Sequence, residues 1–142
     1  MDFLTSFHIS GTGLTAQRTR MNVISMNLAN AETTRTAKGG PYRRKVAVVE
    51  QEPVKDFDAA LATQSDACGV RITEIVEDKT PFSQVYNPSH PDADDAGFVM
   101  MPNINLIVEM TNMMLARRNY EANVAAINAA KGMALKALEL GR

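Results

Sequence analysis

Apolar residues recur at seven-residue intervals near the start of the chain. This spacing lays side chains along one side of a helix, the pattern of a coiled-coil seam, and predicts a helix over residues 3–30. Gly11 and Gly13 each weaken that helix by about 1 kcal/mol relative to Ala, so we expect it to be unstable alone. The repeating positions are Phe7, Leu14, Met21 and Leu28, with Phe3, Ser10, Gln17 and Ile24 as their companions.

A second and longer apolar stripe predicts a helix over residues 103–140. Asn103 and Asn105 are both suited to cap its start, and Gly141 is suited to end it. Arg117 and Lys131 interrupt the stripe, but their long stems can lie along apolar surface. The stripe consists of Leu106, Met110, Met113, Tyr120, Val124, Ile127, Ala134 and Leu138.

The segment between these helices, residues 31–102, has a different pattern. Alternating and β-branched residues predict short strands, and Gly-Gly-Pro at residues 39–41 predicts a turn. The strands are expected over residues 42–50, 70–76, 82–86 and 97–101.

The fold class that follows is mainly α with a small β-rich insert. Its parts are an N-terminal helix within residues 1–30, a β-rich insert with loops over 31–102, and a long C-terminal helix within 103–142. Each terminal helix carries a narrow apolar stripe that needs a partner. We therefore expect the two helices to pair as an antiparallel coiled coil in an elongated molecule.

Charge and composition exclude several classes of function. The 142 residues carry a formal net charge of −1, which argues against a nucleic-acid-binding surface. No apolar run approaches the roughly 20 residues of a membrane-spanning helix, so direct membrane insertion is not expected. The N-terminus lacks the basic start and apolar core of a cleaved signal peptide. The single cysteine, Cys68, excludes an intramolecular disulfide. These properties alone indicate a soluble cytoplasmic protein.

Three short motifs suggest chemistry, and each has a simpler interpretation. Residues 11–16 match the loose G-x-G-x-x-A pattern of dinucleotide-binding loops, but no buried strand precedes them. Residues 90–97 are rich in Asp without the spacing of a calcium loop or further zinc ligands, so they read as a polar turn. The basic residues 43–45 are expected to form a solvated strand face or to meet an acidic partner. We expect no catalytic, cofactor-binding or metal-binding residues, and therefore no enzyme.

Several asparagines lie within the predicted helices, where Asn is a mediocre helix former. They either face solvent or form hydrogen bonds across a helix–helix or subunit contact, where a buried polar group fixes the register. Both interpretations stay open from the residues alone. The asparagines concerned are Asn22, Asn27, Asn30, Asn119 and Asn123.

Five runs of sequence resemble the flagellar rod and hook family of axial proteins. NVISMNLANAETT at residues 22–34 and ARRNYEANV at residues 116–124 resemble its two terminal signatures. Residues 36–44, 86–97 and 101–105 resemble the proximal rod members in particular. The motif residues are Asn27, Asn30, Thr33, Pro102, Asn103, Asn119 and Asn123.

The resemblance implies a structural subunit of the proximal rod, which self-assembles into the shaft that transmits torque. It implies export by the flagellar type III apparatus without a cleaved signal, and a final location in the basal body across the periplasm. The implied partners are copies of the chain, other proximal and distal rod proteins, the inner membrane ring and the export apparatus, with no nucleic acid. The alternatives are a cytoplasmic coiled-coil adaptor and, remotely, a nucleotide-binding enzyme. The residues expected to form the assembly seam are Leu14, Met21, Ile24, Leu28, Met110, Met113, Tyr120, Val124, Ile127 and Leu138.

Overall fold

The computed structural model describes residues 3–53 and 68–141 of the chain. Two helices flank two small antiparallel sheets, so the predicted mainly helical fold with a β insert is confirmed. The three predicted parts, residues 1–30, 31–102 and 103–142, contain residues 1–2, 54–67 and 142, which lie outside the described ranges. The elements are α1 (Phe3–Ala29), β1 (Lys45–Pro53), β2 (Cys68–Glu77), β3 (Ser83–Tyr86), β4 (Phe98–Met101) and α3 (Leu106–Leu140).

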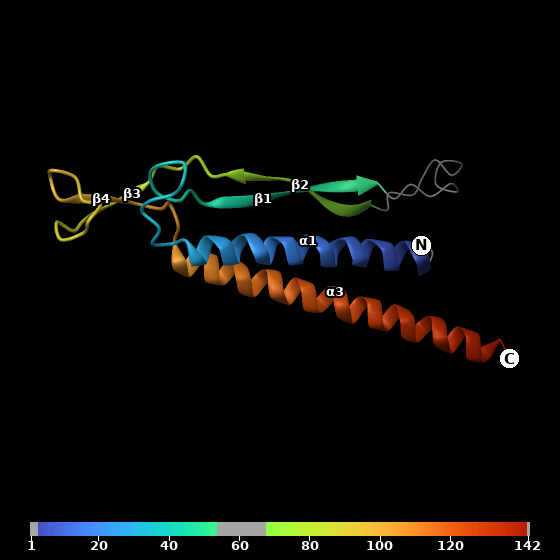
Figure 1. Ribbon diagram of the computed structural model, residues 1–142. Helices are drawn as coiled ribbons and strands as arrows, with labels where there is room; N and C mark the ends of the chain where they lie inside the picture. Colours follow the sequence, from blue (N-terminus) through green and yellow to red (C-terminus); the bar gives the residue numbers. More distant parts are fainter. Residues whose placement is uncertain (1–2, 54–67, 142) are drawn as a thin grey trace.

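The elements form three layers with α1 in the middle. The β1–β2 pair covers one side of α1, and α3 runs antiparallel along the other side (Figure 1). Because α1 is covered twice, it contributes half of the six buried apolar residues of the described ranges, namely Ala16, Val23 and Ile24. Toward its C-terminus α3 diverges from α1 (Figure 1).

The start of α3 shows which of the two predicted caps is used. The side-chain oxygen of Asn105 accepts hydrogen bonds from the backbone N–H groups of Ile107 and Val108, at 3.1 and 3.2 Å. These are orphan donors of the first helical turn, so Asn105 is the N-cap. Asn103 is not a cap and bonds to other segments instead. Gly141 caps the C-terminus as predicted.

The strand β1 begins three residues later than predicted because the backbone of residues 42–44 is engaged elsewhere. The N–H of Tyr42 donates to the carbonyl of Thr33 at 3.0 Å, and the N–H of Arg44 donates to Asn103 Oδ1 at 2.9 Å. From Lys45 onward the strand pairs with β2, starting opposite Glu77, with a bulge between residues 48 and 49.

The strands β3 and β4 form a separate hairpin at the end of the molecule where α1 ends and α3 begins (Figure 1). Val99 is buried on one face of this hairpin. The connecting loop is closed by Asp94, whose Oδ1 accepts from the N–H groups of Ala96 and Phe98 at 3.0 and 2.8 Å. Gly97, with φ of +81°, completes the turn. The Asp-rich segment is thus a turn, as its composition predicts.

Candidate functional site

A buried polar cluster lies where α1 ends and both β1 and α3 begin. Its centre is Glu109 in the first turn of α3, whose side chain is only 1% exposed. Arg44 donates from Nε to Glu109 Oε1 at 2.9 Å, and its Nη2 forms an ion pair with the same oxygen at 2.8 Å. A carboxylate this deeply buried requires such a charged partner, because an isolated buried charge is strongly unfavourable.

Asn27, near the end of α1, joins the helices to the sheet through four hydrogen bonds. Its Nδ2 donates to Glu109 Oε2 at 3.0 Å and to the carbonyl of Lys45 at 2.8 Å. Its Oδ1 accepts from the N–H of Lys45 at 2.9 Å and from the hydroxyl of Tyr42 at 3.2 Å. The amide is 1% exposed, and these bonds use its full hydrogen-bonding capacity.

The outer side of the cluster connects Arg44 to the end of β2. Arg44 Nη1 donates to Asp78 Oδ2 at 3.1 Å. Asn103 accepts from the Arg44 backbone and donates to Thr80 Oγ1 at 2.7 Å. Asn27, Arg44, Asp78, Asn103 and Glu109 are called the polar junction below. It ties α1, the β1–β2 pair and the start of α3 into one unit.

Contacts within the polar junction favour the ionised forms of Asp78 and Arg44. The N–H of Thr80, followed by the Arg44 guanidinium, holds the pKa of Asp78 below its usual 3.8. Burial alone would lower the pKa of Arg44, but hydrogen bonds from Arg44 to Glu109 and Asp78 outweigh it and raise that pKa. Burial raises the pKa of Tyr42, with Glu77 and Glu109 adding to the effect. Asp78 and Arg44 are therefore held in their charged forms.

The basic residues 43–45 therefore differ from the solvated strand face or partner surface that was expected. Arg44 is paired inside the chain, and its side chain is only 25% exposed. Arg43 lies 4.2 Å from the ring centroid of Phe82 and donates to the carbonyl of Asp78. Sequence reasoning missed this because Glu109 is separated from Arg44 by 65 residues. A carboxylate at the start of an apolar stripe was the only local signal.

The seam between α1 and α3 uses positions of α3 that are seven residues apart and mostly small or polar. Ala116 is fully buried and Ala130 is 7% exposed, in register with Glu109. Asn123 belongs to the same series and lies so close to α1 that a methyl group on Gly13 would come within 2.8 Å of its Nδ2. Small residues let the two helices approach closely here.

The predicted seam residues fall into two groups. Ile24 is buried, and Leu14, Met21, Leu28, Met113, Tyr120, Val124 and Ile127 are partly buried. Met110 and Leu138 are 54% and 72% exposed, so they do not belong to the seam within one chain. The positions of α3 that α1 covers are Glu109, Ala116, Asn123 and Ala130, which lie one residue before the predicted series that contains Met110. Close approach of the two helices favours small side chains at these positions over large apolar ones.

The motif residues are distributed between the polar junction and the helices. Asn27 and Asn103 belong to the junction, and Pro102 is buried beside it in sequence. Thr33 donates from Oγ1 to Asn30 Oδ1 at 3.2 Å, in the turn that follows α1. For the asparagines, the structure realises both interpretations: Asn27 and Asn123 serve the helix contact, whereas Asn22 and Asn119 are exposed.

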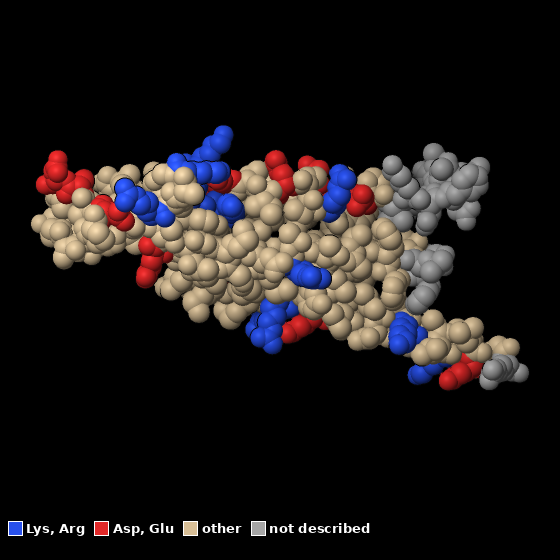
Figure 2. All heavy atoms as spheres, in the orientation of Figure 1, with Lys and Arg blue, Asp and Glu red and all other residues tan. Residues whose placement is uncertain are grey.

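The outer face of α3 carries large apolar side chains that nothing in the described chain covers. Charged residues gather along the β1–β2 edge and toward both ends, with a further group at the lower edge halfway along α3, and much of the surface between these groups is uncharged (Figure 2). Exposed fractions range from 49% for Val108 to 76% for Ile107. The first turns of α3 contribute Leu106, Ile107, Val108, Met110, Met114 and Leu115 to this face, called the outer α3 face below.

The remaining candidate chemistry is not assembled. Residues 11–16 lie in the middle of α1, preceded by helical residues instead of a strand, so the dinucleotide-loop alternative is wrong. Within residues 3–53 and 68–141, no three metal-ligating side chains come together. In the same ranges, neither helix is long and apolar enough to cross a membrane.

Comparison with known proteins places this arrangement among flagellar components. The family "Flagella basal body rod protein" matches residues 7–35, and "Flagellar basal body rod FlgEFG protein C-terminal" matches residues 95–140. The chain is 43% identical to the flagellar basal-body rod protein FlgC of Bacillus subtilis, over 98% of this chain and 100% of the relative. It is 41% identical to FlgC of Escherichia coli O6:H1 over 100% of both chains. It is 40% identical to FlgC of Borreliella burgdorferi over 99% of this chain and 98% of the relative.

Proposed function

Because the chain belongs to the FlgC family of flagellar basal-body rod proteins and is a structural subunit of that rod, we propose that it forms part of the proximal rod and transmits torque. It self-assembles and joins the other proximal and distal rod proteins. Residues 31–102 make lateral contacts, while the terminal helices form the inner layer.

The observation that carries this proposal is the outer α3 face. Ile107 and Met114 are 76% and 60% exposed, and Met110 lies between them along the helix. An apolar patch of this kind on a soluble chain marks a surface that another protein covers. In a rod, neighbouring subunits surround each helix and supply that cover. Met side chains suit such contacts because they adapt to irregular surfaces.

Assembly is coupled to folding in this proposal. The helices α1 and α3 are largely disordered in the free chain and pair as an antiparallel coiled coil on incorporation. The apolar surface buried within one chain is small, since only six apolar residues of the described ranges are buried. The ordering entropy is therefore offset only when neighbours add contacts.

Circular dichroism of the dilute purified chain tests this coupling. We expect weak helicity without a cooperative thermal transition, and helicity that rises with assembly. A fully helical free chain that melts sharply would show that folding does not need neighbours.

Substitutions in the seam test the assembly role. Val124→Asp or Ile127→Asp places a charge in a partly buried helix contact, and we expect loss of the chain from isolated basal bodies and loss of swimming. Val124→Leu and Ile127→Val are the matched controls and should assemble normally. Normal swimming of both Asp variants would contradict the coiled-coil role.

The route and the neighbours are further parts of the proposal. The chain is exported by the flagellar type III apparatus without cleavage, and in the basal body it lies near the inner membrane ring and export apparatus. Support comes from membership of the family. Intact mass measurement of the chain from purified basal bodies tests cleavage, and cross-linking with mass spectrometry identifies the neighbours. A chain found only in the soluble fraction would favour the adaptor alternative instead.

A further inference from the structure

The guanidinium of Arg43 is held firmly in place, yet part of it is unused. Its Nη1 donates to the carbonyls of Asp78 and Thr80 at 3.0 and 3.1 Å, and its Cζ lies 4.2 Å from the ring centroid of Phe82. A guanidinium has five N–H donors, of which Nη1 carries two. The three donors on Nε and Nη2 have no acceptor within residues 3–53 and 68–141. Arg43 therefore keeps one edge open.

The neighbouring Arg44 shows what this edge binds when it is filled. There, Nε and Nη2 lie 2.9 and 2.8 Å from a carboxylate oxygen of Glu109. The N–H groups of Nε and Nη2 form a planar fork that matches a carboxylate, which makes such pairs strong and geometrically specific. Residues 43–45 are thus not one continuous surface, because Arg44 is bound inside the polar junction. Arg43 has the same fork without the carboxylate.

Arg43 lines a groove of about 440 Å³ in which positive charge is in excess. The other charged lining residues are Lys38, Lys45 and a single acid, Glu77. Glu77 forms an ion pair with Lys38 at 3.6 Å. Lys45 instead lies over the ring of Tyr42, with Nζ 5.8 Å from the centroid, and has no ion pair with any described residue. Two cations of this groove therefore lack a carboxylate partner in the described part of the chain.

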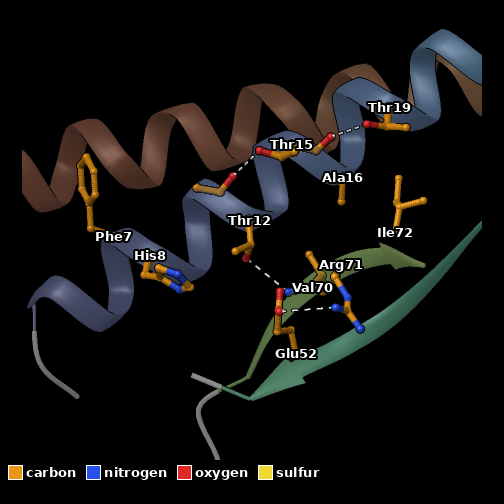
Figure 3. A pocket seen from close by; sticks show the side chains of 11 residues that line it. Phe7, His8, Thr12, Thr15, Ala16, Thr19, Glu52, Val70, Arg71 and Ile72 are labelled. Atoms are coloured by element: carbon orange, nitrogen blue, oxygen red, sulfur yellow. Dashed lines mark hydrogen bonds and ion pairs between the residues drawn. The ribbon is translucent and has the colours of Figure 1, made fainter. Parts of the chain in front are cut away.

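A larger groove between α1 and β2, of about 620 Å³, does not have this excess of charge (Figure 3). Its charged lining residues, Arg71 and Glu52, form an ion pair with each other at 3.9 Å (Figure 3). An acidic partner that entered there would compete with Glu52 for the same arginine. In the groove at Arg43 it would meet an open fork and an unpaired lysine, so charge complementarity favours an acid at Arg43.

We propose that the groove at Arg43 binds an acidic segment of a neighbouring rod subunit, with one carboxylate in the Nε–Nη2 fork of Arg43 and Lys45 close by as a second positive charge. The rings of Tyr42 and Phe82 line the same groove and suit apolar groups beside the acid. Because Arg43 is already fixed, little side-chain ordering is required on binding. The inference rests on the proposed rod function and assigns a chemistry to one of the lateral contacts of residues 31–102.

A water-soluble carbodiimide, which joins an amine to a carboxylate in direct contact, tests the proposal in isolated basal bodies. Arg43→Lys places an amine at the fork, and Lys45 supplies a native amine that needs no substitution. Peptide mass spectrometry should find residue 43 or Lys45 joined to an Asp or Glu of another chain. Groups held side by side react at a raised effective concentration, so this product should exceed the interchain product of Arg71→Lys by roughly tenfold.

The controls compare cations that have an acid of their own. Arg71→Lys should be joined only to Glu52 of the same chain, and the Lys38–Glu77 pair, 3.6 Å apart, is an internal reference for yield. A second copy and a different rod protein are both accepted sources of the acid. Only intrachain products at residue 43 and Lys45, or products with a protein outside the rod, would overturn the proposal. Absence of even the unmodified chain from basal bodies would instead refute the proposed function.

Discussion

The polar junction allows a sharp prediction about the ion pair between Arg44 and Glu109. The perturbation is a cycle of Arg44→Met, Glu109→Met and the double variant, which removes each charge while keeping an unbranched side chain. The two partners are unequal, because Glu109 is 1% exposed whereas the Arg44 side chain is 25% exposed and has Asp78 as a second acid. We therefore expect unequal effects on the free energy of unfolding.

The magnitudes follow from what each variant leaves behind. Arg44→Met leaves a buried carboxylate with Asn27 as its remaining donor, and removing one partner of a buried pair costs about 3–5 kcal/mol. Glu109→Met leaves Arg44 paired with Asp78 and partly in water, so about 1–3 kcal/mol is expected for the lost hydrogen bonds. The double variant replaces the pair with apolar groups, and its cost should be near zero to about 1 kcal/mol.

The assay measures the urea concentration that releases half of the chain from isolated basal bodies, because there the chain is held folded. Arg44→Met should need the least urea, Glu109→Met an intermediate amount, and the double variant nearly as much as the unmodified chain. Equal effects of the two single variants, or a double variant as weak as the sum of both, would refute the reasoning that a stranded buried carboxylate dominates.

Three further predictions concern other parts of the chain. Because hydrogen bonds hold the pKa of Asp78 below 3.8, the stability that ionised Asp78 contributes is complete above pH 3.8 and is lost as the pH falls through the lowered pKa. The urea concentration that releases the chain from basal bodies should therefore be the same at pH 5 and pH 7. Asp78→Asn should remove the Asp78-dependent loss of stability below pH 3.8. Gly11→Ala should stabilise α1 by about 1 kcal/mol in urea release, whereas Gly13→Val should weaken the rod because the new side chain meets Asn123. Gly97→Ala should strain the turn of the β3–β4 hairpin and lower the urea concentration that releases the chain from basal bodies, since the φ of +81° disfavours a side chain and a Cβ would come within 2.9 Å of the Tyr86 ring.

Hydrophobic spacing was enough to predict both helices, and the caps show how far local rules reach. The helix α3 starts after Asn105, one of two candidates with identical side chains. Only tertiary contacts separate them, because Asn103 is engaged by the Arg44 backbone and by Thr80. The same contacts remove residues 42–44 from the β ladder, which is why the predicted strand began too early.

The companion stripe of α3 could not be predicted from hydrophobicity. A rule that searches for large apolar residues selects Met110 and Leu138, whereas the covered positions include Glu109 and Ala116. A buried glutamate looks like a surface residue until its arginine partner is known, and that partner lies in another part of the chain. Buried polar clusters of this kind depend on contacts between distant segments, which a single sequence does not reveal.

The central position of α1 has a consequence for when the chain can fold relative to its export. The residues that cover α1 are distant in sequence: Asn27 and Glu109 are 82 residues apart, and Thr12 and Val70 are 58 apart. Such long-range contacts form late and slowly. For a chain exported as we propose, whichever end leaves the channel first must wait for the other before α1 is covered on both sides. Because of this topology, the chain cannot complete its fold until both of its ends have left the export channel.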